Sequence, residues 1–259
     1  MPFPSQSENF TINIQTPVGP IQASVAVPSG FIPLTTIIPL MQSIGSEIQE
    51  LASTAITKTR EPISCQKGCA ACCRMLIPMA PPEALALKTY VETWEPSRRD
   101  VLLARLQSIQ DQLQKAGLDE PLKQVVFSQE QFTDEDLEPI NHAYYALRIP
   151  CPFLENEACS IYDYRPSACR ELLVTSPAER CQDFANQDIH PIPVPVRIGT
   201  VLSHLWSTLH QGPIRLIPLP YALLWADNSP VKEEATLSGP QLLQQALETT
   251  AQYLQHASS

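Results

Sequence analysis

The chain has 259 residues, which is enough for a full hydrophobic core in one large domain or in one domain with appendages. Its formal net charge is −10 and no basic stripe offsets it, so we expect neither nucleic acid nor a membrane as a partner. Proline is abundant, with 26 residues, and glycine is scarce, with 8, which indicates stiff connections between elements.

The first third of the chain predicts a hairpin followed by a helix. Apolar residues alternate with polar ones on both sides of a turn at residues 16–20, which predicts a β-hairpin over 10–27. Apolar residues at three- and four-residue steps then predict a helix over 40–58 that leads to the first cysteines. We treat residues 1–59 as this N-terminal hairpin and helix.

The same region bears on the compartment. The first basic residue is Lys58, so we expect neither a secretory signal nor a transit peptide, both of which need early positive charge. The longest apolar run, 31–41, is interrupted by Pro33 and Pro39 and is too short to cross a bilayer. We therefore expect a cytoplasmic protein, in which clustered thiols bind metal more often than they form disulfides.

Three helices are predicted in the middle of the chain. One follows Ala80 and has two prolines in its first turn. A second begins with a capping pair of Ser97 and Asp100 and ends at Gly117. A third covers residues 129–148, with an acidic run as its solvated start.

The last part of the chain is also mainly helical. Pro166 opens a short helix, residues 191–196 are extended, and a further helix follows from Val201. The last helix begins at a capping box of Ser238 and Gln241. The predicted fold is mainly α with small β elements (α+β), and the tryptophans belong to its core.

Eight cysteines fall into two tight groups, and the rest of the chain contains none. This distribution predicts a shared purpose. We therefore expect the two groups to converge in space on a metal centre. The first group is Cys65, Cys69, Cys72 and Cys73, and the second is Cys151, Cys159, Cys169 and Cys181.

Thiolate is a soft ligand that suits zinc and iron–sulfur centres. The first group has the spacing C-x3-C-x2-C, in which one loop presents three sulfurs, and Gly68 leaves room for close backbone approach. Cys73 directly follows Cys72, and because neighbouring side chains usually diverge, it serves either a second metal or a structural role. The sequence leaves open whether there are two four-sulfur sites or one cluster with spare thiols.

The cysteine motifs resemble a known family. Cys-x3-Cys-x2-Cys-Cys is followed by Cys-Pro-Phe-Leu, Ala-Cys-Ser-Ile-Tyr and Arg-Pro-Ser-Ala-Cys-Arg, and together these are similar to the bacterial cysteine-cluster family labelled YkgJ or CxxCxxCC. The resemblance covers about residues 60–182. It implies a zinc- or iron-chelating domain there, related to flagellin lysine-N-methylase. Residues 183–259 lie outside it, and we expect them to form a helical extension packed on the same core.

Arg165 and Arg170 flank Cys169 and are predicted cofactor-binding residues, because arginine can offset the negative charge of several thiolates. The alternative is surface pairing with Asp163 or Glu171. The histidines lack the four-residue spacing of a two-histidine metal site and are interpreted as structural, although His190 could complete a site in space.

These observations favour a metal-binding protein with a cysteine-ligated iron–sulfur cluster or zinc and a structural, metal-handling or redox role. An all-cysteine ligand set slightly favours iron–sulfur. The alternatives are an iron–sulfur enzyme that modifies protein side chains, as the methylase relative implies, and an interaction module with a protein partner. Two features argue against a radical S-adenosylmethionine enzyme. Ala71 stands where such enzymes usually have an aromatic residue before the third cysteine, and the sequence shows no alternating strand–helix series that could form their barrel.

Overall fold

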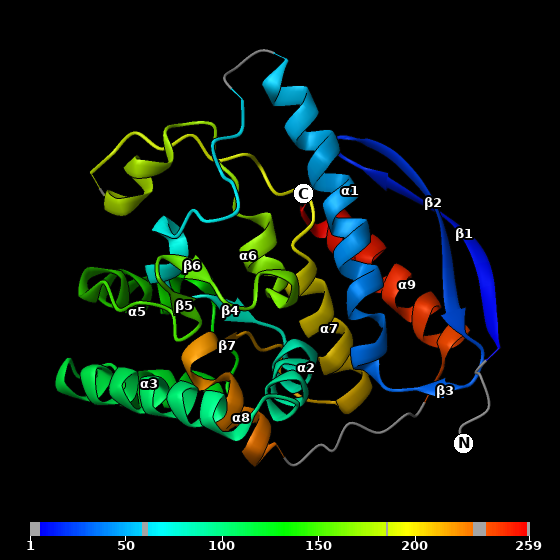
Figure 1. Cartoon of the computed structure of the whole chain (residues 1–259). Coiled ribbons are helices and arrows are strands. Elements are labelled where there is room, and N and C mark those ends of the chain that lie inside the picture. The colour runs from blue at the N-terminus through cyan, green and yellow to red at the C-terminus, as the bar shows by residue number, and fades with distance from the viewer. Residues whose placement is uncertain (1–5, 59–61, 185, 230–236, 258–259) are drawn as a thin grey trace.

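The computed structural model describes residues 6–58, 62–184, 186–229 and 237–257. It confirms a mainly helical fold with small antiparallel strand pairs, and Figure 1 shows the arrangement. The hairpin, α1 (Ile38–Thr57), α7 (Ile198–His210) and α9 (Gly239–Ala257) lie on one side. α3 (Pro96–Lys115), α5 (Asp134–Leu147) and the cysteine-bearing segments lie on the other. No helix in the described ranges is long and apolar enough to cross a membrane.

The N-terminal hairpin is the longest pair of strands. β1 (Ser7–Thr16) and β2 (Gly19–Pro28) pair antiparallel, with Ile14 opposite Ile21 next to the turn. The buried residues of the pair alternate with exposed ones, as the pattern predicts: Ile12, Ile14, Ile21, Val25 and Val27 are buried, and Phe10 and Ala23 are half-buried. The hairpin packs on α1 (Ile38–Thr57) and α9 (Gly239–Ala257).

A close backbone approach joins the segment after the hairpin to the start of the last helix. β3 (Phe31–Ile32) pairs with β8 (Leu237–Ser238), and α9 begins directly afterwards. A Cβ atom at Gly239 would lie 1.9 Å from the carbonyl oxygen of Pro28, so only glycine fits there. The predicted pairing of Ser238 with Gln241 is present, because the Gln241 side chain accepts hydrogen bonds from the backbone N–H and the hydroxyl of Ser238.

The helices between the cysteine groups are α2 (Pro81–Glu92), α3 (Pro96–Lys115), α4 (Asp119–Phe127) and α5 (Asp134–Leu147). The prediction of a Ser97–Asp100 cap is wrong. Glu95 is the N-cap of α3 and makes no side-chain cap, because Pro96 already occupies the first helical turn. Helix α4 was not predicted, and α5 begins later than predicted, at a capping box made by Thr133 and Asp136.

Short elements connect the remaining helices. α7 packs on α1, α2 and α9, and all three tryptophans are buried in the core, as predicted. The remaining elements are β4 (Pro78–Met79) paired with β7 (Ile217–Pro218), β5 (Leu154–Glu155) paired with β6 (Ala158–Cys159), α6 (Ser167–Glu171), α7 (Ile198–His210), α8 (Ala222–Asn228), and the 3-10 turns η1 (Leu34–Ile37), η2 (Ala71–Arg74), η3 (Tyr162–Tyr164), η4 (Ala178–Asp183) and η5 (Leu219–Tyr221).

Candidate metal centre

The first cysteine group lies on a tight loop that ends in η2. The backbone N–H of Cys69 donates to the carbonyl of Gln66 at 3.0 Å, and that of Cys73 donates to Ala70 at 3.0 Å. Gly68 has a φ of 96°, a left-handed conformation that glycine adopts without strain. The loop thus presents its cysteines within two short turns.

The second group is distributed over separate elements. Cys151 precedes β5, Cys159 lies in β6, Cys169 lies in α6, and Cys181 lies in η4. The short helix predicted after Pro166 is present as α6, and β5 and β6 form a small hairpin.

Backbone contacts bring the two groups together. The N–H of Cys151 donates to the carbonyl of Cys73 at 2.7 Å, and the N–H of Val174 lies 3.4 Å from the sulfur of Cys65. Turn η2 also packs against η4, which carries Cys181. The expected convergence of the two cysteine groups is therefore present.

Cys65, Cys69, Cys72 and Cys181 line one small cavity of about 20 Å³. We call these residues the first thiol set. Most of the other side chains around this cavity are apolar, and none is a histidine or a carboxylate. Burial raises the pKa of the Cys65 and Cys181 thiols, and the neighbouring sulfurs of the set raise both further.

The other four cysteines form a second thiol set of Cys73, Cys151, Cys159 and Cys169. Burial, together with the charges of Cys159 and Cys72, raises the pKa of Cys151 to about 12. Burial also raises the pKa of Cys169 well above its ordinary value, with added repulsion from Cys151, Cys72 and Cys159. These thiols are thus close enough to repel one another once ionised, which a positive metal ion would relieve.

Cys72 and Cys73 connect the two sets. Their sulfurs are hydrogen-bond partners, in contrast to the expected divergence of adjacent side chains. This hydrogen bond is the main cause that lowers the pKa of Cys72 to about 7, with burial opposing it and Arg165 assisting. The same hydrogen bond and burial raise the pKa of Cys73. Cys72 is thus the thiol that ionises most readily among the shifted ones.

The donor chemistry fits the zinc or iron that the motifs imply. All eight cysteines are free thiols, and they gather in one region. Across the described ranges, however, no three His, Cys, Asp or Glu side chains already stand in metal-binding geometry. The fold therefore collects the sulfurs, and binding a metal would require some of them to turn toward it.

The two predicted cofactor-binding arginines lie beside the second set. The charge of Arg165 lowers the thiol pKa of Cys72, Cys159 and Cys169, although other causes dominate at each. Its guanidinium stacks 3.6 Å from the ring centre of Tyr162. This position is compatible with the predicted charge compensation.

Arg170 is held by backbone carbonyls. Its Nε donates to the carbonyl of Arg165 at 3.0 Å, and its Nη2 donates to that of Asp163 at 2.6 Å. Among the described residues, neither arginine forms an ion pair with Asp163 or Glu171. The Glu171 carboxylate instead accepts the N–H of Ile198 at 2.8 Å.

A comparison with protein families agrees with this geometry. Residues 64–189 match the CxxCxxCC family model, described as "Putative zinc- or iron-chelating domain". This segment belongs to the CxxCxxCC family. The resemblance drawn from the motifs is thereby confirmed, and it supports metal binding by the domain. No curated protein and no solved structure matches the chain significantly.

His190, the histidine that the sequence left as a candidate metal ligand, lies just beyond the matched segment. Its ring is 3.0 Å from the carboxylate of Asp188, and its backbone N–H donates to the hydroxyl of Ser176. His210 stacks on Trp206, with ring centres 3.9 Å apart. Both rings thus have partners other than the cysteines.

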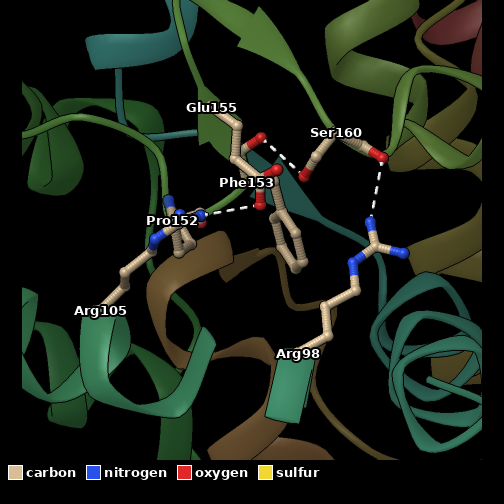
Figure 2. A network of polar contacts seen from close by, with 6 residues as sticks. All are labelled: Arg98, Arg105, Pro152, Phe153, Glu155 and Ser160. Atoms are coloured by element: carbon tan, nitrogen blue, oxygen red, sulfur yellow. Dashed lines mark hydrogen bonds and ion pairs between the residues drawn. The ribbon is translucent and has the colours of Figure 1, made fainter. Parts of the chain in front are cut away.

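Sequence reasoning missed the residues that hold the β5–β6 hairpin of the CxxCxxCC domain. Arg105 of α3 donates to the carbonyl of Pro152 at 3.2 Å and to Glu155 at 3.0 Å, and Figure 2 shows this contact. Arg98 donates to the carbonyl of Ser160 at 3.4 Å on the other side. The two arginines are seven residues apart and so share one face of the helix, a spacing that could have revealed them.

Glu83 of α2 is the second residue that was missed. It is buried, with 4% exposed, and its carboxylate accepts from the N–H and hydroxyl of Ser167 at 2.8 and 2.7 Å. It also accepts the N–H of Ala80 at 3.0 Å. Glu83 therefore joins the start of α2 to the start of α6, which carries Cys169 of the CxxCxxCC domain.

Proposed function

We propose that the CxxCxxCC domain holds a cysteine-ligated metal centre, zinc or iron–sulfur, with a structural, metal-handling or redox role. Its ligands would be the two thiol sets, one on each side of the Cys72–Cys73 pair. The supporting observation is the cavity lined by four cysteines from both groups, because apolar packing alone gives no reason to collect four thiols.

The first thiol set supports a single ion. A cavity of about 20 Å³ has room for one small species of the size of a water molecule. Four thiolates around one ion are the usual ligand set of structural zinc. Zinc would enter this set as a closed centre, without a position open to substrate.

The composition of the whole centre supports iron–sulfur. Both sets consist of cysteine only, and such all-thiolate ligation holds two-iron and four-iron clusters. Arg165 would offset the negative charge of these thiolates. The chemistry supplied by a cluster would be electron transfer, whereas zinc would supply cross-linking alone.

Either metal would link segments that are far apart in the sequence. The first set takes three sulfurs from the 65–73 loop and one from η4. The second takes Cys73 from that loop and the others from the segment before β5, from β6 and from α6. The energy of metal binding would thus stabilise the packing of these loops against each other.

The test is anaerobic purification followed by metal analysis and a visible spectrum. Iron with sulfide and a brown colour would identify a cluster, and zinc in a colourless protein would identify zinc. Protein that carries neither metal, and that takes up neither when reduced and supplied with it, would contradict the proposal.

Serine substitutions test the assignment of ligands. We expect Cys65→Ser and Cys181→Ser to remove the same metal, so that the double variant loses no more than either single one. Cys159→Ser should remove the metal of the other set. Full metal content in Cys65→Ser, or losses of Cys65→Ser and Cys181→Ser that add up, would refute the assignment to a common set.

A further inference from the structure

A groove lies beside the metal centre. It has a volume of about 830 Å³ and lies between α1, α2 and the segment from η3 to α6. Pockets of about 300–1,000 Å³ are typical of small-molecule sites. The apolar side chains of Ile38, Met79 and Leu87 form part of its lining.

Two arginines line the groove at the η3–α6 segment. Arg165 and Arg170 are oriented by backbone carbonyls through Nε and, in Arg170, one Nη. These contacts fix the guanidinium planes without neutralising them. In the described ranges, no carboxylate forms an ion pair with either arginine, although the charges of Glu83 and Asp163 are close enough to act on Arg170.

Two acidic residues also line the groove. The carboxylate of Glu83 is buried and accepts from Ala80 and Ser167, so its charge is already solvated by the protein. Asp163 contributes its backbone carbonyl to Arg170, and its side chain makes no ion pair with the guanidinium. Neither carboxylate thus forms an ion pair with a guanidinium group, and the N–H groups that the backbone carbonyls leave over can donate to a ligand.

An aromatic wall stands next to the arginines. The rings of Tyr90 and Tyr164 stack 3.7 Å apart with an angle of 15° between their planes, and both line the groove. Tyr164 is 58% exposed, so its ring is accessible to a ligand. A flat apolar body would fit against this wall while its charged end reaches the arginines.

We propose that this groove binds a small amphipathic anion, a molecule with one carboxylate or phosphate group and a flat apolar body. The anionic group would accept hydrogen bonds from the guanidinium groups of Arg165 and Arg170, which suit both carboxylate and phosphate. The apolar body would lie along Leu87 and Tyr90. This site shares Arg165 with the proposed metal centre, but it needs the groove and its arginines, not a particular metal.

The experiment uses the full chain with its metal as purified, and calorimetry with four probes. Phenyl phosphate and phenylacetate carry both required features, whereas inorganic phosphate lacks the body and benzyl alcohol lacks the charge. We expect at least one of the first two to bind about tenfold or more tightly than the last two. The tighter of the two identifies the head group as phosphate or carboxylate.

Two variants address the two halves of the site. Arg170→Gln removes one charge and should weaken binding about tenfold or more. Ala86→Phe adds a ring from α2 into the groove and should block binding without changing any charge. Arg99→Gln, on α3 outside the groove, is the matched arginine control and should bind as the parent does.

Metal content and melting temperature are measured for every variant. Loss of binding in Arg170→Gln and Ala86→Phe, with the metal content and melting temperature of the parent, supports the groove. Failure of both amphipathic probes, equal binding of benzyl alcohol, or undiminished binding in Ala86→Phe would overturn it. Because metal is assayed separately, any of these results leaves the metal centre itself unaffected.

Discussion

Removal of the Glu83 carboxylate should weaken both the fold and the metal centre. Glu83→Ala leaves two buried backbone N–H groups, those of Ala80 and Ser167, without their acceptor. It also removes the acceptor of the Ser167 hydroxyl, which is 2.7 Å from the carboxylate. Ser167 begins α6, so the disturbance reaches Cys169 two residues further along.

The magnitude follows from the number of donors. Each buried polar group left without a partner costs about 1–3 kcal/mol. Because the two Ser167 donors can relax together, we expect a loss of about 3 kcal/mol in the free energy of unfolding. For a chain of this size, that corresponds to a fall of roughly 6–12 °C in melting temperature.

Urea unfolding of the metallated protein measures the free energy, and metal analysis measures the centre. Glu92→Ala is the matched control, since Glu92 lies on the same helix, is 57% exposed and forms only an ion pair of 3.8 Å with Lys88. We expect the control to change the free energy of unfolding by less than about 0.5 kcal/mol. A Glu83→Ala variant as stable as this control would refute the reasoning, because the buried donors would then not need the carboxylate.

Two further predictions concern the parts of the core that support this arrangement. Gly239→Ala should lower the free energy of unfolding in a urea titration by about 1–3 kcal/mol, because its Cβ would lie 1.9 Å from the Pro28 oxygen. Gly212→Ala is the control and should be close to neutral, since no atom lies within 4 Å of its Cβ. Equal stabilities of the two variants would contradict this prediction. Tyr221→Phe should cost about 1–2 kcal/mol, because the buried hydroxyl donates to Asp119 at 2.7 Å. Burial raises the pKa of Asp119, but hydrogen bonds from Lys123 and Tyr221 outweigh this effect and lower the pKa overall. The stabilisation that the Asp119 carboxylate gives to the fold is therefore present above about pH 4 and disappears as the pH falls through the folded pKa. The difference between Tyr221→Phe and the parent should therefore shrink in acid, and a constant difference from pH 7 to pH 3 would contradict this assignment.

Local patterns predicted the elements whose signals are local. The hairpin of β1 and β2 follows from strict alternation, and α5 and α9 begin at capping residues that are visible in the sequence. Helix α4 has no such signal. It is nine residues long and contains Pro121, and it depends on the burial of Leu122 and Val126 and on the bond between Asp119 and Tyr221, which are tertiary contacts.

The candidate site, like the fold, has features that follow from the sequence and features that depend on tertiary contacts. The clustering of cysteines predicted that the two groups meet, because ligands of one centre must converge. The division into two sets could not be predicted, since it depends on η4 folding back to place Cys181 beside Cys65. The close approach of the Cys72 and Cys73 sulfurs was also missed, because it results from the tight turn of η2.

The hydrophobic core, more than the metal, accounts for the meeting of the two cysteine groups. Ile149, Phe153 and Ile161 flank the cysteines of the β5–β6 region and are almost fully buried in the main core. The hydrogen bond from Cys151 to Cys73 joins the two loops through the backbone, independently of any sulfur ligand. In small zinc domains the metal replaces a core that is too small, whereas this chain buries a core that extends through all its large helices. A metal bound here would therefore orient thiols that packing has already gathered, and its removal should loosen the 65–73 loop and η4 before it affects the helices.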